Sequence, residues 1–227
     1  DMGFAGYNVT MPNKTHVLPY LDELTEAAEL MGAVNTVVIK DGKSIGHNTD
    51  GAGFVVNLKN HGVDFEGKKI TIVGAGGAGS AIFTQLALDG AASIDVYNIK
   101  DDFFEATRQR VAELSEKTGC DITLTDLADR DALGKSVAKS CVFINATRMG
   151  MPPFENECLL DEDMLHDGLA VADTVYEPRE TKLIAMAKAH GLVTCPGLGM
   201  LLSQAALGEK IWCDASMPVD YIEEKFC

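Results

Sequence analysis

The sequence predicts an α/β protein in which a doubly wound parallel sheet carries a smaller α/β lobe built from both ends of the chain. From about residue 69, short apolar runs alternate with helical patterns, as in βαβ units whose parallel sheet is covered on both faces. A glycine-rich turn directly follows the first of these runs. The two ends of the chain do not show this alternation of strand and helix patterns. We therefore expect a larger domain over residues 51–198 and a second lobe from residues 1–50 and 199–227.

The smaller lobe shows strand and hairpin signals. In the stretch YNVTMP, polar Asn8 and Thr10 alternate with apolar residues, which is typical of a strand with one polar face. Further along, NTVVIK and SIGHN flank the pair Asp41-Gly42, and this order predicts a β-hairpin over residues 35–48.

The larger domain shows alternating strand and helix signals. KITIVG and SIDVYN predict strands because they are short and rich in β-branched residues. Between them, Ala78, Ile82 and Leu86 recur at every fourth position, the apolar stripe of a helix that ends at Gly90. Residues 102–117 predict a charged helix. Helical segments, one of them at 180–191, separate most of the remaining expected strands at 121–125, 141–147, 169–174 and 192–195.

Composition and charge exclude several classes of protein. Lys and Arg total 19 against 34 Asp and Glu, and the resulting net charge of −15 repels nucleic acid and anionic lipid. Because no apolar run reaches about 18 residues and no charged-then-apolar leader is visible, we expect neither a membrane span nor a secretory signal. The six cysteines are widely scattered and the five histidines lack metal-ligand spacing, which favours free thiols in a reducing cytoplasm and no metal site.

The glycine-rich turn indicates a dinucleotide site. Gly74, Gly76 and Gly79 form G-x-G-x-x-G directly after a strand and at the start of a helix. In a Rossmann-type sheet, the first glycine permits the tight turn, the second admits a pyrophosphate and the third lets helix and strand pack closely. The helix start offers free N–H groups to the phosphates. A glycine-rich turn without a ligand is the plainer alternative.

The residues after the second strand bear on the choice of dinucleotide. An acidic side chain there binds the ribose hydroxyls of NAD, whereas a basic one accommodates the extra phosphate of NADP. After Asn98, Asp101 suits the first role and Lys100 the second. Either residue could instead belong to the cap of the next helix. The sequence favours NAD and leaves NADP open.

Five polar residues lie at the ends of apolar segments upstream of the glycine motif: Asn8, Thr10, Lys14, Asn35 and Asp50. Reduction of a ketone by NAD(P)H requires a proton donor for the oxygen, and oxidation of the alcohol requires a base. Lys14 and Asp50 could form such a pair, with the other three holding substrate hydroxyls. Their ordinary interpretation is a solvated lysine and a turn-forming aspartate.

The same residues belong to motifs that resemble one family. In chain order these are NVTMPNK, AVNTVV, GHNTDGAGF, GAGGAG, NAT-x-x-GM, DTVYEPRETKL and GLGMLLSQA, and together they resemble shikimate dehydrogenases. YNIKDDFFE and the basic Arg148 in NATRMGM resemble most closely the quinate/shikimate dehydrogenase branch, which accepts NAD and takes quinate as well as shikimate. The resemblance implies reversible NAD(P)-dependent reduction of 3-dehydroshikimate to shikimate, in the pathway to chorismate and the aromatic amino acids.

The resemblance also implies residue roles. Lys14 and Asp50 match the catalytic pair, and the matching substrate-binding residues are Asn8, Thr10, Asn35, Tyr176 and Gln204. The matching cofactor-binding residues are Gly74, Ala75, Gly76, Gly77, Ala78, Gly79, Asn98, Lys100, Asp101, Thr147, Met149 and Gly197. Plainer alternatives stay open: Gln204 on a solvated helix face, Tyr176 packed beside Pro178, and Met149 in the core.

The start of the chain departs from the family pattern. Family members carry an earlier βαβ segment, with a Ser-x-Ser pair that holds the substrate carboxylate, before the NVTMPNK motif. This sequence begins at Asp1 without such a segment. We therefore expect a fragment with a truncated smaller lobe, weaker substrate binding and an uncovered sheet edge that promotes association.

Two other functions remain as alternatives. One is a dinucleotide-binding fragment or regulatory homologue without catalysis, although Lys14, Asp50, Asn35 and Gln204 are all retained. The other is a two-lobed dehydrogenase acting on a folate or an aminoacyl-tRNA, and the acidic charge argues against the latter. The expected partner is a small-molecule substrate, with a homodimer left open.

Overall fold

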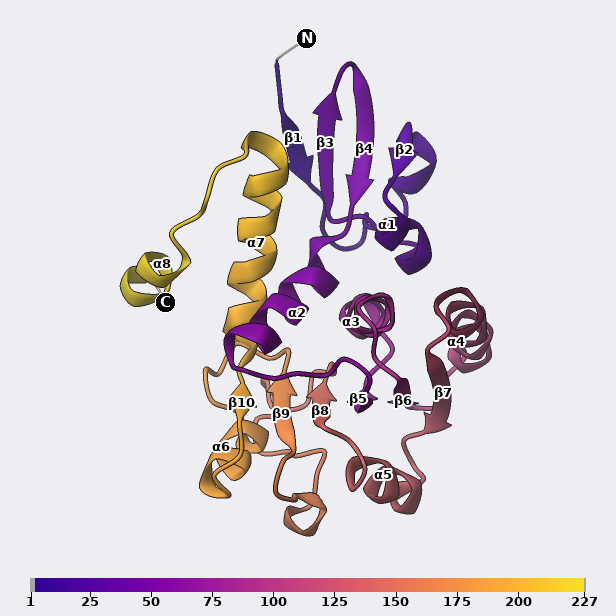
Figure 1. The fold of residues 1–227 in the computed structure, drawn as a ribbon, viewed down its shortest axis with the longest axis vertical. Coiled ribbons are helices and arrows are strands. Elements are labelled where there is room, and N and C mark those ends of the chain that lie inside the picture. The colour runs from indigo at the N-terminus through magenta and orange to yellow at the C-terminus, as the bar shows by residue number, and fades with distance from the viewer. Residues whose placement is uncertain (1–2, 227) are drawn as a thin grey trace.

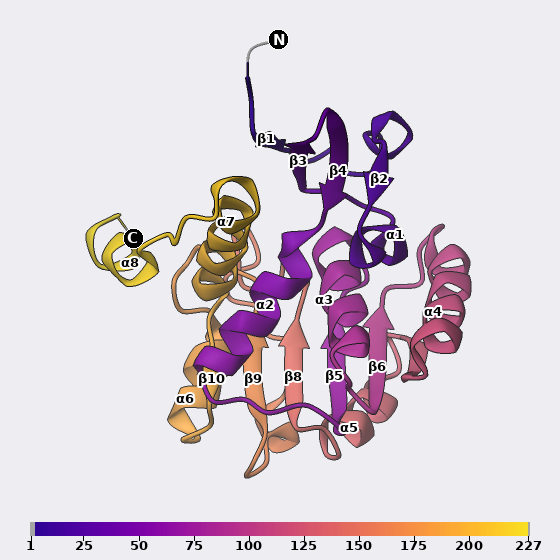
Figure 2. The ribbon, with the colours of Figure 1, turned by 45° about the horizontal axis from the view of Figure 1, so that its top comes forward.

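The computed structural model describes residues 3–226, so Asp1, Met2 and Cys227 lie outside the described residues, together with the expectations about the chain start and the sixth thiol. Two sheets form the framework (Figures 1 and 2). One has four strands in the order β1-β3-β4-β2, and the other has six in the order β10-β9-β8-β5-β6-β7. All pairs in the six-stranded sheet are parallel, which confirms the predicted fold class.

The six strands of the larger sheet lie where short apolar runs predict them. Their bounds are β5 Lys69–Val73, β6 Ser93–Asn98, β7 Asp121–Asp126, β8 Val142–Asn145, β9 Ala170–Asp173 and β10 Thr194–Cys195. β10 is shorter than its apolar run because Pro196 follows, and proline has no N–H for a sheet hydrogen bond. The two central strands are almost fully buried, as expected when helices cover both faces.

Helices cover both faces of this sheet. Their bounds are α3 Gly77–Leu88, α4 Phe104–Thr118, α5 Arg130–Val137 and α6 Lys182–Ala189. In Figure 1, α3 and α4 lie above the row of strands, and α5 and α6 lie below it. α4 ends at Gly119, whose left-handed φ of 74° favours glycine. The core beneath α3 includes Phe83, Leu86 and Ile72.

The smaller sheet contains the predicted hairpin. Its strands are β1 Gly6–Asn8, β2 Glu23–Leu24, β3 Thr36–Lys40 and β4 Lys43–His47, and α1 Glu26–Met31 packs beside them. The turn between β3 and β4 has φ of 51° at Asp41 and 79° at Gly42, the left-handed values that a tight two-residue hairpin requires. Two 3-10 turns, Leu18–Tyr20 and Glu162–Met164, lie in loops.

Two helices connect the sheets. α2, Thr49–Asn60, starts at the smaller sheet and lies between α3 and α7, Gly197–Cys213, as Figure 2 shows. Glycines bring the backbones together: a Cβ at Gly51 would clash with the carbonyl of Ala81 on α3, and one at Gly53 would lie 2.6 Å from the backbone nitrogen of Gln204 on α7. α8, Val219–Phe226, follows α7.

The cysteines that the structure describes are free thiols: Cys120, Cys141, Cys158, Cys195 and Cys213. Burial raises the pKa of Cys195 to about 12 and that of Cys120 to about 11, so these two thiols are packing residues rather than nucleophiles. Within residues 3–226, no helix has the length and apolar character needed to cross a membrane.

Candidate active site

The larger sheet has its topological switch point between β5 and β8. From β5 the chain proceeds through α3 to β6 on one side, whereas β8 is followed by β9 on the other. Ligands of doubly wound sheets bind in the crevice outside the carboxyl ends of the strands at this point. Gly74 leaves β5 there with φ 107°, and a Cβ on it would lie 2.6 Å from the carbonyl oxygen of Ala146, after β8.

The glycine loop is shaped to admit a phosphate group. The backbone nitrogen of Ala75 donates to Oδ1 of Asn98 at 3.1 Å, which fixes the loop against the end of β6. A Cβ placed at Gly76 or Gly77 would meet no atom within 4 Å, so open space lies in front of the α3 N-terminus. Gly79 faces the carbonyl of Gly74, where a side chain would clash. This open helix start, with its free N–H groups, fits a dinucleotide pyrophosphate.

A cavity of about 570 Å³ lies beside this loop. Among the predicted cofactor residues, its lining includes Ala75, Gly76, Gly77, Asn98 and Asp101. Asp101 accepts from the backbone nitrogen of Phe103 through Oδ1, at 3.0 Å, so its other oxygen faces no partner among the described residues. Lys100 is exposed and does not line the cavity. The structure therefore brings the predicted acidic residue, and not the basic one, to the cavity.

A second cavity, of about 590 Å³, lies between the smaller sheet and the α3 N-terminus. Its lining includes every residue predicted to bind or convert substrate, together with two glycine-loop residues and Gly197: Asn8, Thr10, Lys14, Asn35, Asp50, Gly77, Ala78, Tyr176, Gly197 and Gln204. Lys14 also lines the first cavity. The two cavities therefore meet at Lys14 and Gly77, so a ligand in one can reach a ligand in the other.

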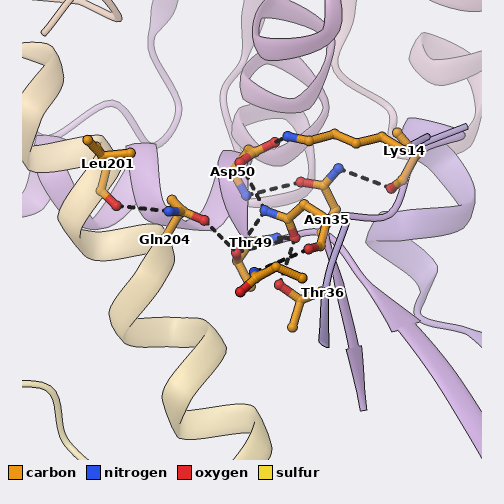
Figure 3. A network of polar contacts seen from close by, with 10 residues as sticks. Lys14, Asn35, Thr36, Thr49, Asp50, Leu201 and Gln204 are labelled. Carbon is orange, nitrogen blue, oxygen red and sulfur yellow. Dashed lines mark hydrogen bonds and ion pairs between the residues drawn. The ribbon is translucent and has the colours of Figure 1, made fainter. Parts of the chain in front are cut away.

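Lys14 and Asp50 form an ion pair in this second cavity. Nζ of Lys14 lies 2.7 Å from Oδ2 of Asp50, and the two side chains are 24% and 14% exposed. Asn35 donates from Nδ2 to the other carboxylate oxygen at 2.9 Å, as Figure 3 shows. Because Asn35 is buried, it fixes the plane of the Asp50 carboxylate. The pair is held in place while remaining accessible from the cavity.

Residues that sequence reasoning did not single out complete this network. The backbone nitrogen of Thr49 donates to Oδ1 of Asn35 at 2.9 Å, and Thr49 Oγ1 lies 3.5 Å from Oε1 of Gln204. Asn48 caps α2 by accepting from the backbone nitrogen of Asp50 at 3.0 Å. Their position inside the motif GHNTDGAGF was the available signal, because an Asn-Thr-Asp run before a helix is a capping pattern.

Thr147 and Met149, predicted to contact cofactor, line neither cavity. They lie in the loop after β8, which Asn145 holds. Behind Asn145 lies Asp173, which is fully buried and accepts hydrogen bonds from Asn145, Val175 and Thr181. Burial raises the pKa of Asp173 from 3.8 to about 6, although those hydrogen bonds favour its charged form.

This shift predicts a pH dependence of stability. Because the folded protein holds the Asp173 proton more tightly than the unfolded chain does, the stabilisation is fully present below pH 3.8 and is lost as pH rises through about 6. Between about pH 7.5 and about pH 5, the unfolding free energy of the wild type should rise by about 1 kcal/mol relative to D173N. Urea unfolding at both pH values measures this difference; parallel pH curves for the two proteins would contradict it.

The chain is similar in sequence to known proteins. A family model described as the shikimate dehydrogenase substrate binding domain matches residues 1–37. The shikimate dehydrogenase (NADP(+)) of Listeria monocytogenes is 50% identical over 224 residues, which cover 98% of this chain and 77% of that relative.

Solved structures share the fold of this chain. The crystal structure of shikimate 5-dehydrogenase from Listeria monocytogenes in complex with shikimate and NAD has a TM-score of 0.95 at 50% identity, covering 98% of this chain and 78% of that one. Quinate dehydrogenase from Corynebacterium glutamicum in complex with NAD has a TM-score of 0.87 at 32% identity, covering 99% and 78%. The likeness thus includes both sheets described here.

Proposed function

The chain belongs to the shikimate dehydrogenase family, and on that premise we propose that it catalyses the reversible NAD(P)-dependent reduction of 3-dehydroshikimate to shikimate. The observation that carries this proposal is the Lys14–Asp50 ion pair, which faces a cavity that adjoins the glycine loop. A non-catalytic binding module would have no need of such a pair at that junction.

The residues of the chain manage charge and the proton. A bound nicotinamide supplies or accepts the hydride. The ammonium group of Lys14 has three N–H donors, and Asp50 engages one of them, which leaves two for a substrate oxygen. In the reducing direction Lys14 donates a proton to the oxygen as the carbonyl becomes an alcohol, and in the oxidising direction it takes the proton back. Asp50, oriented by Asn35, holds the Lys14 ammonium group in position.

The cavity lining suits a polyhydroxylated ring. Asn8, Thr10, Tyr176 and Gln204 surround the ion pair with hydroxyl and amide groups, each able to donate and accept. Quinate, which has a similar ring, is a second candidate substrate, supported by the likeness to quinate dehydrogenase.

A single assay tests the proposed activity. NAD(P)H formation would be followed by absorbance with shikimate or quinate, each paired with NAD or NADP. Turnover in at least one pairing, saturable in both reactants, is the expected result. Absence of turnover in all four pairings, with dinucleotide binding retained in calorimetry, would favour the binding module instead.

For the cofactor, our proposal is a preference for NAD. The support is that Asp101 lines the first cavity, whereas Lys100 does not. The Listeria monocytogenes relative is named for NADP(+), whereas the similar crystal structure from that organism contains NAD. Both dinucleotides therefore belong in the test.

Asp101→Ser should change this preference. Loss of a charged hydrogen bond to a ribose hydroxyl should raise KM for NAD about tenfold. KM for NADP should fall or stay unchanged, because the carboxylate that repels its phosphate is gone. Steady-state kinetics with both cofactors measures the ratio of KM for NAD to KM for NADP. Asp102→Ser, one position later on the exposed surface, is the matched control. An unchanged ratio in D101S would rule out the ribose role.

A cytoplasmic location is also proposed. It is supported by the free thiols among the described residues, which fit a reducing compartment. The homodimer stays a prediction.

A further inference from the structure

We infer that Asp173 is a positioning residue, whose buried carboxylate orients Asn145 and thereby holds the Thr147–Met149 segment beside the glycine loop. This role rests on the proposed dehydrogenase activity, because it concerns how the cofactor is held. Asp173 lies at the end of β9, and Asn145 lies at the end of the neighbouring β8.

The Asp173 carboxylate is fully engaged by donors. Oδ1 accepts from Nδ2 of Asn145 and from the backbone nitrogen of Val175, both at 2.9 Å, and Oδ2 accepts from the hydroxyl of Thr181 at 2.7 Å. The side chain is completely buried. Since an ionised carboxylate only accepts hydrogen bonds, it requires a donor from each neighbour, including Asn145.

That requirement sets which way the Asn145 amide points. With Nδ2 facing Asp173, Oδ1 faces the loop and accepts from the backbone nitrogen of Thr147 at 3.0 Å and from its hydroxyl at 2.7 Å. Nδ2 also donates to the carbonyl of Met149 at 2.9 Å. A flipped amide would put oxygen against the carboxylate and nitrogen against the Thr147 N–H, and these bonds would be lost.

The orientation of the Asn145 amide also determines the hydrogen bonds within the loop after β8. Because the Thr147 hydroxyl donates to Asn145, its lone pairs are free to accept from the backbone nitrogen of Met149, at 3.0 Å. Thr147 also touches the glycine loop, since a Cβ at Gly74 would lie 3.0 Å from its Cγ2. A chain of oriented bonds thus runs from Asp173 to the switch point where the dinucleotide is expected.

Burying an ionised carboxylate such as Asp173 has an unfavourable desolvation free energy. Among the residues that the structure describes, no cationic group contributes to its ionisation, and burial raises its pKa despite the hydrogen bonds it receives. An apolar side chain would avoid this desolvation penalty at the end of β9. The acceptor that orients Asn145 is what an apolar residue could not provide.

The test compares four single variants of the full chain and one double variant. Asp173→Ser keeps a short polar group that can accept from Val175 but is too short to reach Asn145, so KM for the dinucleotide should rise about tenfold. kcat should change less than about twofold, because among the described residues neither Lys14 nor Asp50 hydrogen bonds to Asp173 or to the Thr147–Met149 segment. Asp173→Asn keeps an oxygen for Asn145 and should restore KM to within about twofold of the wild type.

Two controls separate positioning from general destabilisation. Thr181→Val removes a bond on the far side of the carboxylate, and should lower the melting temperature without changing KM for the dinucleotide. In an Asn145→Ala background, D173S should have no further effect on this KM, because Asp173 acts through Asn145. Circular dichroism verifies that each variant is folded.

Several outcomes would overturn the role. One is an unchanged KM for the dinucleotide in folded D173S. Another is an equal rise of this KM in D173N and D173S. The third is a KM in the double variant that equals the product of the separate N145A and D173S effects. If D173S does not fold, Asn145→Asp removes the same contact from the other side, and an unchanged KM there would also overturn it. Failure of the proposed function is distinct, because the wild type itself would then show no turnover.

Discussion

Replacement of Lys14 by Ala is expected to lower kcat/KM for shikimate oxidation by at least about 100-fold, the usual contribution of a positioned proton-transfer group. Within residues 3–226, the substitution removes the lysine ammonium group that lines both cavities and leaves the Asp50 carboxylate bonded to the side chain of Asn35. Affinity for the dinucleotide, measured by calorimetry without substrate, should stay within about twofold of the wild type, because the glycine loop is untouched.

The matched control for this variant is Lys43→Ala. Lys43 also forms a lysine–carboxylate ion pair in the smaller sheet, with Glu23 at 2.5 Å, but both partners are exposed and line neither cavity. An exposed pair of this kind contributes little to stability, so activity and stability should stay at wild-type levels. If Lys14→Ala retained more than about a tenth of the wild-type kcat/KM, another group would have to handle the proton.

Gly53→Ala is expected to lower the free energy of unfolding by about 3 kcal/mol, the upper range for overpacking a core. Its Cβ would lie 2.6 Å from the backbone nitrogen of Gln204 and 2.8 Å from its Cα, and backbone cannot rotate away as a side chain could. α2 and α7 would have to separate, which would also shift Gln204 in the substrate cavity. Urea unfolding measures the loss, and KM for shikimate should rise with it.

Gly134→Ala provides the control for this effect. Gly134 is also a helical glycine, in α5, but a Cβ there would meet only Cε of Met164, at an ordinary 3.8 Å. Without a clash, alanine should stabilise the protein by up to about 1 kcal/mol through its better helix propensity. Equal stability of G53A and the wild type would show that the contact between α2 and α7 can open to admit a methyl group.

The larger sheet could be predicted closely because its strands are short apolar runs bounded by turn residues, and its topology follows from their alternation with helices. α2 is different. Its sequence carries a capping signal, the Asn-Thr-Asp run, but Gly51 and Gly53 lower helix propensity in its first two turns, so no helix is predicted there. The helix is stabilised by packing on α3 and α7, where those glycines permit close contact, and packing partners cannot be read from local sequence.

In the site, too, some residues could be predicted from the sequence and others could not. Lys14 and Asp50 stood out because charged residues at the ends of apolar segments invite explanation, and the structure brings them together across 36 positions. Asp173 did not stand out, because an aspartate at a strand end usually forms a turn. Its burial and its contact with Asn145, 28 positions away, arise from parallel neighbours in the sheet. The roles of these residues remain proposals that the variants above address.

The glycine contact between α2 and α3 has a consequence for reaction geometry. Asp50 lies in the first turn of α2, and the adjacent Gly51 packs on the α3 backbone at Ala81, in the helix that starts at the glycine loop. The helix that carries the proposed proton-transfer residue Asp50 is therefore in backbone contact with the helix that starts at the proposed phosphate site. Hydride transfer requires a short, constant donor–acceptor separation. The backbone contact between α2 and α3 would keep the proposed proton-transfer pair at a constant distance from the proposed phosphate site.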